Sequence, residues 1–332
     1  MPEFRRDATT GEWVILAAER AKRPGGRSKR RSRREEVDFA PDCPFCPGNE
    51  GQTPPEILRR PAQGNWLVRV VPNKYPALIP DLPAEEPSGG ELHEHLPARG
   101  HYEVIIEGRA HRSRLAPAEP AVLQEVFLAA RERYRAFGTE PDLAFVSLFK
   151  NHGPGAGASL PHPHWQLAVT PVVPGDLERM LHIARSYWQR RQSSVYGDLL
   201  ERELAAGTRI VEVGQRFVAF APYAPRWAGE TWIVPREEWA SFAETDDDGV
   251  TQFAELLHDT LTRLAGGLDE PDCNVTIFSA PLNAPDVAGF RWHGRIQPRL
   301  TVRGGFELGS GIAITILAPE QTAELLRNAA AD

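Results

Sequence analysis

Residues 150–166 read KNHGPGAGASLPHPHWQ, and this stretch decides how the chain is interpreted. The small residues of Gly153–Ser159 allow a ligand to approach the backbone closely, and successive backbone N–H groups in such a loop can hold phosphate oxygens. No Gly-Lys-Ser/Thr follows, so this is not a Walker loop. In a strand, His162, His164 and Gln166 would share one face. An edge strand with outward polar residues is the alternative, but the clustered Pro and Gly favour a ligand site.

The same order of elements occurs twice around this stretch: strand, strand, helix, strand, loop and strand. The first copy is expected at Trp66–Pro72, His101–Glu107, Ala121–Phe137, Leu143–Phe149 and Pro161–Pro171. The second is expected at Arg216–Pro222, Glu230–Pro235, Val250–Ala265, Cys273–Phe278 and Phe290–Leu300. A helical segment, Asp176–Leu204, separates the copies. The pattern predicts an α+β fold of two tandem halves, residues 1–190 and 191–332, with mainly antiparallel sheets and flanking helices.

Cys43 and Cys46 form a Cys-x-x-Cys pair, which has three interpretations: a zinc site, a redox pair or chance. A redox pair would need a βαβ context, which the pattern lacks. A closed zinc site needs two further nitrogen or sulfur ligands. His93 and His95 have suitable spacing, but they lie in an acidic, Pro-rich loop where solvated polar residues are expected.

Composition excludes several classes of protein. The 332 residues carry a net charge of −7, so nucleic-acid binding is not the first expectation, although residues 20–34 hold nine Lys or Arg and form either a solvated basic loop or an anion-binding arm. No apolar run approaches the length of a membrane span, and the N-terminus has no secretory h-region. Three cysteines exclude a disulfide framework and indicate a reducing, cytoplasmic compartment.

The motif in 150–166 resembles that of the galactose-1-phosphate uridylyltransferase family, the His-Pro-His-x-Gln transferase branch of the histidine-triad superfamily. Four further segments are similar to family blocks: Arg5–Pro24, the Cys43–Cys46 pair, Val71–Pro76 and Pro298–Gly311. The resemblance therefore covers nearly the whole chain. It implies two tandem histidine-triad-like halves, of which the first is catalytic, and a homodimer.

The resemblance also implies roles for individual residues. His164 would be the nucleophile, while Gln166, Asn151 and Ser159 would contact the phosphoryl groups. Zinc would be held by the two cysteines and two histidines: Cys43, Cys46, His111 and His162. Further substrate contacts are implied for Arg20 and Arg23 with the phosphates of a nucleotide sugar, Asn73 with the nucleoside and Glu307 with the hexose.

The chemistry is intelligible from the residue types. A neutral imidazole can attack a nucleotide α-phosphorus and leave again, which suits a two-step exchange. When both leaving and entering groups are phosphates, no general acid is needed, and the neutral Gln166 can serve as a hydrogen-bond donor. Hydrolases of the superfamily have His at that position, where protonation helps a poorer leaving group. Gln166 thus favours a transferase.

Three functions follow from these observations. The first is exchange of UMP between UDP-glucose and galactose 1-phosphate, in galactose metabolism. The second uses the same histidine chemistry on ADP-glucose with inorganic phosphate as acceptor, because the Gly-Gly-Phe-Glu block at 304–307 is similar to that of ADP-glucose phosphorylase-like relatives. The third is a non-catalytic nucleic-acid-binding protein that uses the basic loop.

The second half differs from relatives that carry a second metal there. The corresponding segment is Arg291-Trp292-His293-Gly294-Arg295, in which only one histidine remains between two arginines. A divalent cation is disfavoured among these charges. We therefore expect no second metal and interpret His293 as a core or groove histidine.

Overall fold

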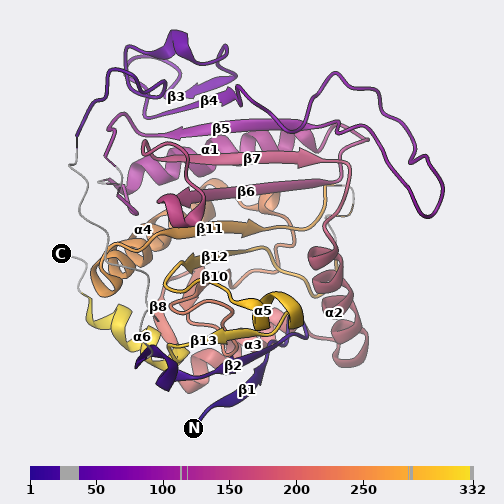
Figure 1. The fold of residues 1–332 in the computed structure, drawn as a ribbon, viewed down its shortest axis with the longest axis vertical. Coiled ribbons are helices and arrows are strands. Elements are labelled where there is room, and N and C mark those ends of the chain that lie inside the picture. Colours follow the sequence, from indigo (N-terminus) through magenta and orange to yellow (C-terminus); the bar gives the residue numbers. More distant parts are fainter. Residues whose placement is uncertain (23–36, 113, 118, 283, 285–286, 330–332) are drawn as a thin grey trace.

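A computed structural model describes residues 1–332 except 23–36, 113, 118, 283, 285–286 and 330–332. Its centre is a ten-stranded sheet with the order β3-β4-β5-β7-β6-β11-β12-β10-β9-β8 (Figure 1). The strands of the first half are β3 (Leu58–Arg60), β4 (Val68–Pro72), β5 (His101–Glu107), β6 (Phe145–His152) and β7 (His164–Thr170). Those of the second half are β8 (Ile210–Val213), β9 (Phe217–Phe220), β10 (Thr231–Pro235), β11 (Cys273–Phe278) and β12 (His293–Pro298).

The sheet order confirms the internal repeat. Each half contributes five strands in the same order, and the two sets meet where β6 pairs with β11. Every neighbouring pair in this sheet is antiparallel. The expected α+β class with tandem halves is thus correct, and the halves share one continuous sheet.

Two long helices, α1 (Pro120–Phe137) and α4 (Asp247–Leu268), pack against each other and cover one face of the sheet (Figure 1). Their apolar sides and the inward residues of both halves form one hydrophobic cluster, which includes Val126, Trp165 and Val275. The division at residues 190 and 191 falls in the last turn of α2 (Gly175–Arg191), and it remains a prediction about domains.

The segment expected to be helical over Asp176–Leu204 forms two helices, because α2 ends at Arg191 and α3 (Val195–Ala206) starts a new helix. Gln192 adopts a left-handed conformation with φ of 56°, which ends α2. The Ser194 side chain then accepts a hydrogen bond from Gly197 N at 3.3 Å and caps α3. Both helices lie on the sheet face opposite to α1 and α4, where α3 packs on β9 and β10.

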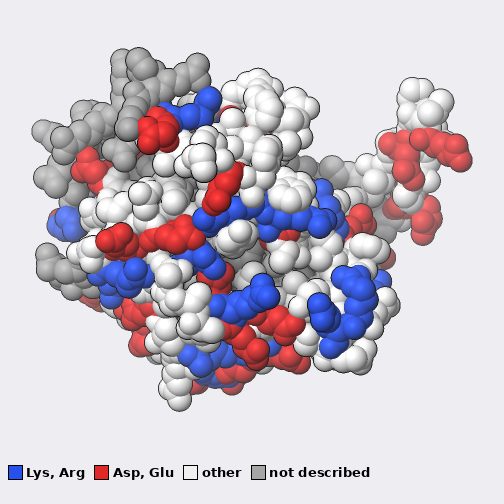
Figure 2. Space-filling model, turned by 90° about the horizontal axis from the view of Figure 1, so that it is seen from below, with Lys and Arg blue, Asp and Glu red and all other residues white. Residues whose placement is uncertain are grey.

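The N-terminal strands and a strand from the C-terminal region meet beyond the second half. Strands β1 (Glu3–Arg6), β2 (Trp13–Leu16) and β13 (Ala313–Thr315) form a separate three-stranded sheet. The short helices α5 (Gly305–Ser310) and α6 (Pro319–Asn328) flank it at the lower end of the molecule (Figure 1). Among the described residues, acidic and basic side chains are interspersed on the face seen from below (Figure 2), and no helix is long and apolar enough to cross a membrane.

Strand β7 shows why the two sheet faces differ. Trp165, Leu167 and Val169 are fully buried against the helices, so His164 and Gln166 point to the opposite face. The alternation seen in the sequence therefore becomes a division between a helix-covered core and a polar sheet face.

A buried ion pair lies beneath the strands that carry this polar face. Lys150 Nζ donates to both carboxylate oxygens of Glu107 at 2.7 Å, and the two side chains are 1% and 0% exposed. Trp165 Nε1 donates to the same carboxylate at 2.6 Å. The network ties β5, β6 and β7 together at the end of the sheet where His164 begins β7.

We expect Lys150→Met to lower the free energy of unfolding by about 3–5 kcal/mol, because the Glu107 carboxylate would stay buried without its counter-charge. Chemical denaturation measures the change. The double variant Lys150→Met with Glu107→Leu should regain most of the loss, since no charge is then buried. Equal stability of Lys150→Met and the unmodified protein would contradict a stabilising role for the pair.

Candidate active site and metal centre

The glycine-rich loop follows β6 and turns through the short 3-10 helix η3 (Pro154–Ala156). Gly153 and Gly157 have φ of 81° and 87°, values that disfavour any residue with a side chain. Gly155 N donates to Asp272 Oδ2 at 2.6 Å, and a Cβ at Gly155 would lie 2.7 Å from that oxygen. The loop therefore needs glycine both for its conformation and for its contact with the second half.

Asn274 on β11 joins the loop to β6. Its Nδ2 donates to Asn151 Oδ1 at 2.7 Å and to Ala156 O at 2.9 Å. A pocket opens beside these groups and is lined by Asn151, Ser159 and the loop backbone. The structure thus brings together Asn151, Ser159 and the glycine-rich loop, and it adds Asn274, which the sequence did not suggest.

His164 has one ring nitrogen engaged and the other available. Its Nδ1 lies 2.8 Å from His162 O, and since a carbonyl only accepts, Nδ1 carries the proton. Nε2 therefore keeps its lone pair. Burial lowers the pKa of His164, so the imidazole is neutral at pH 7. A neutral imidazole with a free lone pair is chemically able to attack phosphorus.

Gln166 is oriented by a neighbour that sequence reasoning missed. The Tyr102 hydroxyl donates to Gln166 Oε1 at 2.8 Å, which leaves the Gln166 NH₂ group as a donor for another partner. Tyr102 lies diagonally across the β5–β7 ladder, in which Val104 is opposite Gln166. The Tyr102 carbonyl also accepts from Asn73 N at 2.7 Å, so Asn73 follows β4 beside the same strand.

Four ligand-type side chains converge next to His164: Cys43, Cys46, His111 and His162. All four are buried, and their ligand atoms lie within 4.8 Å of one another. His162 Nδ1 is 3.8 Å from Cys43 Sγ and 3.7 Å from Cys46 Sγ, and His111 Nδ1 is 3.4 Å from Cys46 Sγ. Metal bonds of about 2.0–2.3 Å in a tetrahedral site separate ligand atoms by roughly 3.3–3.8 Å. The four residues therefore fit a metal.

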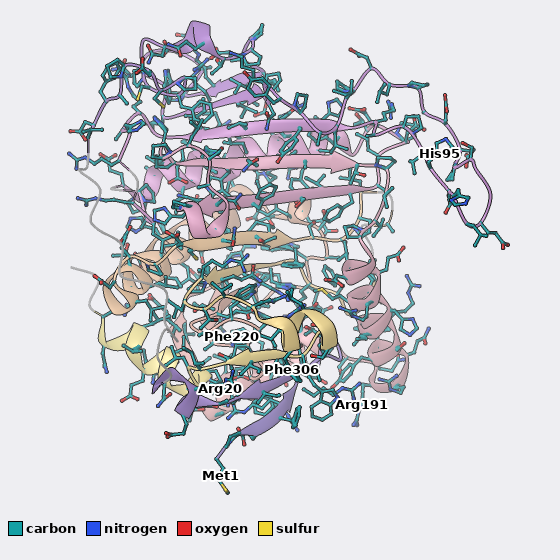
Figure 3. All side chains as sticks on the ribbon, viewed as in Figure 1. Met1, Arg20, His95, Arg191, Phe220 and Phe306 are labelled. Carbon is teal, nitrogen blue, oxygen red and sulfur yellow. The ribbon has the colours of Figure 1, made fainter. Side chains whose placement is uncertain are left out.

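The surroundings of His162 support this fit. Its Nε2 lies 3.1 Å from Gly108 O, so Nε2 donates and Nδ1 presents a lone pair to the cluster. Burial lowers the pKa of His162 to about 4, which keeps the ring neutral. The rival ligand His95 lies on the loop that projects away from the sheet (Figure 3), and neither it nor His93 belongs to the cluster.

Two predicted substrate contacts lie away from His164. Figure 3 places Arg20 near the lower end of the molecule, away from the strands of the first half that include β7. Glu307 accepts from Gly304 N at 2.7 Å and from Ile314 N at 3.2 Å, so its carboxylate stabilises its own loop. Arg23 lies outside the described residues.

His293 is fully buried, and both its ring nitrogens are engaged. Nδ1 donates to Arg291 O at 2.9 Å, and Nε2 accepts from Arg295 Nε at 3.0 Å. The ring stacks on Phe278, with 5.3 Å between ring centroids and 6° between planes. These contacts are those of a core histidine.

Comparison with known proteins bears on this geometry. The family model for the N-terminal domain of galactose-1-phosphate uridyl transferase matches residues 1–174. The chain belongs to the galactose-1-phosphate uridylyltransferase family. The family resemblance inferred from the motif is thereby confirmed, and the protein is a nucleotidyltransferase of this family.

Similar proteins within and around the galactose-1-phosphate uridylyltransferase family cover almost the whole chain. ADP-glucose phosphorylase of Arabidopsis thaliana is 31% identical over 98% of this chain and 92% of its own length. Galactose-1-phosphate uridylyltransferase of Haemophilus influenzae is 29% identical over 98% of this chain and 94% of its own. A crystal structure of the Arabidopsis ADP-glucose phosphorylase with bound ADP-glucose superposes with a TM-score of 0.85, at 29% identity, over 99% of both chains.

We expect Cys43→Ser and His111→Ala each to lower metal content and melting temperature, because three ligands hold a metal less tightly than four. Elemental analysis gives metal per chain, and differential scanning fluorimetry gives the melting temperature. Cys273→Ser is the control, since Cys273 is also a buried free thiol but lies outside the cluster. Full metal content in both cluster variants would remove these residues from the metal site.

We expect Tyr102→Phe to reduce kcat about fivefold with little change in KM, since an unanchored Gln166 amide loses about 1 kcal/mol of orientation. The rate of nucleotidyl transfer is measured under saturating substrate. Tyr187→Phe is the matched control, because it removes a hydroxyl that donates to Asp198 at 2.6 Å between α2 and α3. If the two variants behave alike, Tyr102 does not position Gln166.

Proposed function

We propose that this protein moves a nucleoside monophosphate from a nucleotide sugar to a phosphate-bearing acceptor through a covalent nucleotidyl-His164. The observation that carries the proposal is the hydrogen bond from His164 Nδ1 to His162 O, which leaves Nε2 unprotonated on the residue that directly follows Pro163, the last residue lining the loop pocket. Gln166 supports it, because a neutral amide suits transfer between two phosphates.

In the first step, the Nε2 lone pair of His164 attacks the α-phosphorus and a P–N bond forms. The bond from that phosphorus to the bridging oxygen breaks, and the electron pair leaves with the sugar phosphate. The proton on Nδ1 stays on the ring, where the His162 carbonyl stabilises the positive charge that develops. An oxygen of the acceptor phosphate then attacks the same phosphorus, and the P–N bond breaks.

The other residues of the site hold the phosphoryl oxygens. The Gln166 NH₂ group donates to one oxygen, with its carbonyl end anchored by Tyr102. Loop N–H groups, the Asn151 amide and the Ser159 hydroxyl supply further neutral donors. These donors stabilise charge on phosphorus oxygens without transferring a proton.

The metal in this proposal is zinc, because two thiolates and two imidazoles in a closed tetrahedron are a typical structural zinc set. When bound, zinc would fix the segment before β7. Because His162 is both a candidate ligand and the carbonyl partner of His164, this segment would in turn aim the nucleophile.

ADP-glucose is the donor we favour, with inorganic phosphate as acceptor. The greater similarity to the Arabidopsis ADP-glucose phosphorylase supports this choice. UDP-glucose with galactose 1-phosphate is the second candidate, supported by the matched family model and by relatives named for that activity.

A homodimer would complete the site. Arg20 and Phe306, the neighbour of Glu307, lie at the lower end of the molecule (Figure 3), whereas β7, which His164 begins, lies in the upper half (Figure 1). A second copy would therefore supply Arg20, Arg23 and Glu307. We retain this assembly and a cytoplasmic location as predictions. Analytical ultracentrifugation tests the assembly.

Intact-mass spectrometry tests the proposed chemistry and names the base. The protein is mixed with ADP-glucose or with UDP-glucose, without an acceptor. We expect an adenylyl adduct with the first, and a weaker or absent uridylyl adduct with the second. Preferential uridylylation would reverse the choice of donor. No adduct with either nucleotide sugar would overturn the covalent mechanism.

We expect His164→Gly to abolish adduct formation, because His162 faces the metal cluster and His293 has both nitrogens engaged. Added imidazole should occupy the space left and release a nucleotidyl-imidazole. His182→Gly on the exposed side of α2 is the control. Peptide mapping of the trapped adduct locates the label, and finding it on His152, His162 or His293 would refute the assignment.

A further inference from the structure

A second cavity of about 230 Å³ lies on the same sheet face, in the second half, and is lined by five arginines: Arg179, Arg226, Arg295, Arg299 and Arg303. None of the residues proposed for nucleotidyl transfer lines it. The arginines come from α2, from β12 and from the segments that follow β9 and β12. The fold thus gathers residues distant in sequence around one space.

The positive charge of this cavity exceeds the negative charge paired with it. Glu12 forms ion pairs with Arg179 at 2.7 Å and with Arg226 at 2.8 Å, and Asp176 lies 3.0 Å from Arg179. Within the described part of the chain, no carboxylate lies within ion-pair distance of the remaining three guanidinium groups, those of Arg295, Arg299 and Arg303.

Neutral partners hold two of these three groups in place. Arg295 Nε donates to His293 Nε2 at 3.0 Å, and Arg299 Nε donates to Asn274 Oδ1 at 2.5 Å. The Nε of Arg303 is buried and has no hydrogen-bond partner. Each side chain therefore leaves N–H donors unused next to the cavity.

Aromatic rings fix the guanidinium planes. Arg299 and Arg303 both lie over Trp227, at 3.8 and 4.2 Å from its ring centroid. Arg295 lies 4.1 Å from the centroid of Trp232 and 4.3 Å from that of Phe278. Rigid cations lose little entropy when they bind an anion. With two guanidinium groups over Trp227, its ring is not available to stack on a base.

Mutual repulsion acts on two of these arginines, although the carboxylate of the buried Glu230 near both offsets part of it. Burial, followed by the charge of Arg303, lowers the pKa of Arg299. Burial, followed by the charge of Arg226, lowers the pKa of Arg303. A bound anion would relieve this repulsion.

We propose that the arginine cavity is a second anion site that binds a phosphate group, either as inorganic phosphate or as a sugar monophosphate. Unpaired guanidinium groups give bidentate hydrogen bonds to phosphate oxygens. The volume suits a phosphate with a small attached group, and the absence of a free aromatic face disfavours a nucleobase. This proposal does not depend on the proposed function.

Isothermal titration with inorganic phosphate, at ionic strength matched with chloride, tests the site. Arg303→Gln should weaken phosphate binding at least tenfold, and Arg303→Lys should weaken it less, because the charge remains but the planar fork is lost. Arg190→Gln, an exposed arginine of α2, should bind like the unmodified protein. Ser159→Ala separates this site from the loop beside His164 and should leave the arginine-dependent binding intact.

Arg179→Gln keeps the test valid if Arg303→Gln does not fold, because Arg179 is 42% exposed and lines the same cavity. Arg179→Gln should weaken phosphate binding measurably.

Titration with glucose 1-phosphate distinguishes the two candidate ligands, because tighter binding than that of inorganic phosphate assigns the site to sugar phosphates. Binding that is lost in Ser159→Ala but kept in both arginine variants would overturn the proposal. A changed oligomeric state in Arg303→Gln without phosphate binding would assign the arginines to a subunit interface and also overturn it.

Discussion

The pairing of β6 with β11 is the contact on which the rest of the molecule depends. It turns two half-sheets into one, and in its register Asn151 stands opposite Asn274. From that position Asn274 reaches both Asn151 and the glycine-rich loop, while Asp272 just before β11 accepts the loop's Gly155 N–H. The second half is therefore a structural support for a site whose reactive groups come from the first half.

A chain of directed hydrogen bonds then sets the chemistry. Gly108 O fixes the tautomer of His162, the carbonyl of His162 fixes that of His164, and Tyr102 fixes the amide of Gln166. Each hydrogen bond leaves another polar atom of the oriented side chain available: Nδ1 of His162, Nε2 of His164 and the NH₂ group of Gln166. A change in the orientation of His162 would reach the reacting nitrogen of His164, whereas a change at Tyr102 would reach the Gln166 amide.

Short-range spacing made much of this predictable. The alternation of His162, His164 and Gln166 follows from strand geometry. The Cys-x-x-Cys pair indicates a metal site, but its spacing does not identify the two distant ligands. Tyr102 and Asn274 could not be found in the same way, because their roles depend on the register between strands. The position of Arg20 was also beyond reach, since it requires knowing that β2 pairs with the C-terminal β13.

The two halves contain the same histidine arrangement, but only the first leaves the second ring nitrogen of its histidine free. Strands β7 and β12 occupy equivalent places in the sheet order, and each begins with a histidine whose Nδ1 donates to the carbonyl two residues earlier. In the first half the residue two positions on is Gln166, whose amide is held by Tyr102, so Nε2 of His164 stays free. In the second half that residue is Arg295, which donates to Nε2 of His293 and occupies the lone pair. The same arginine lines the second cavity. Arg295 therefore occupies the lone pair of His293 and also adds positive charge to the proposed anion site.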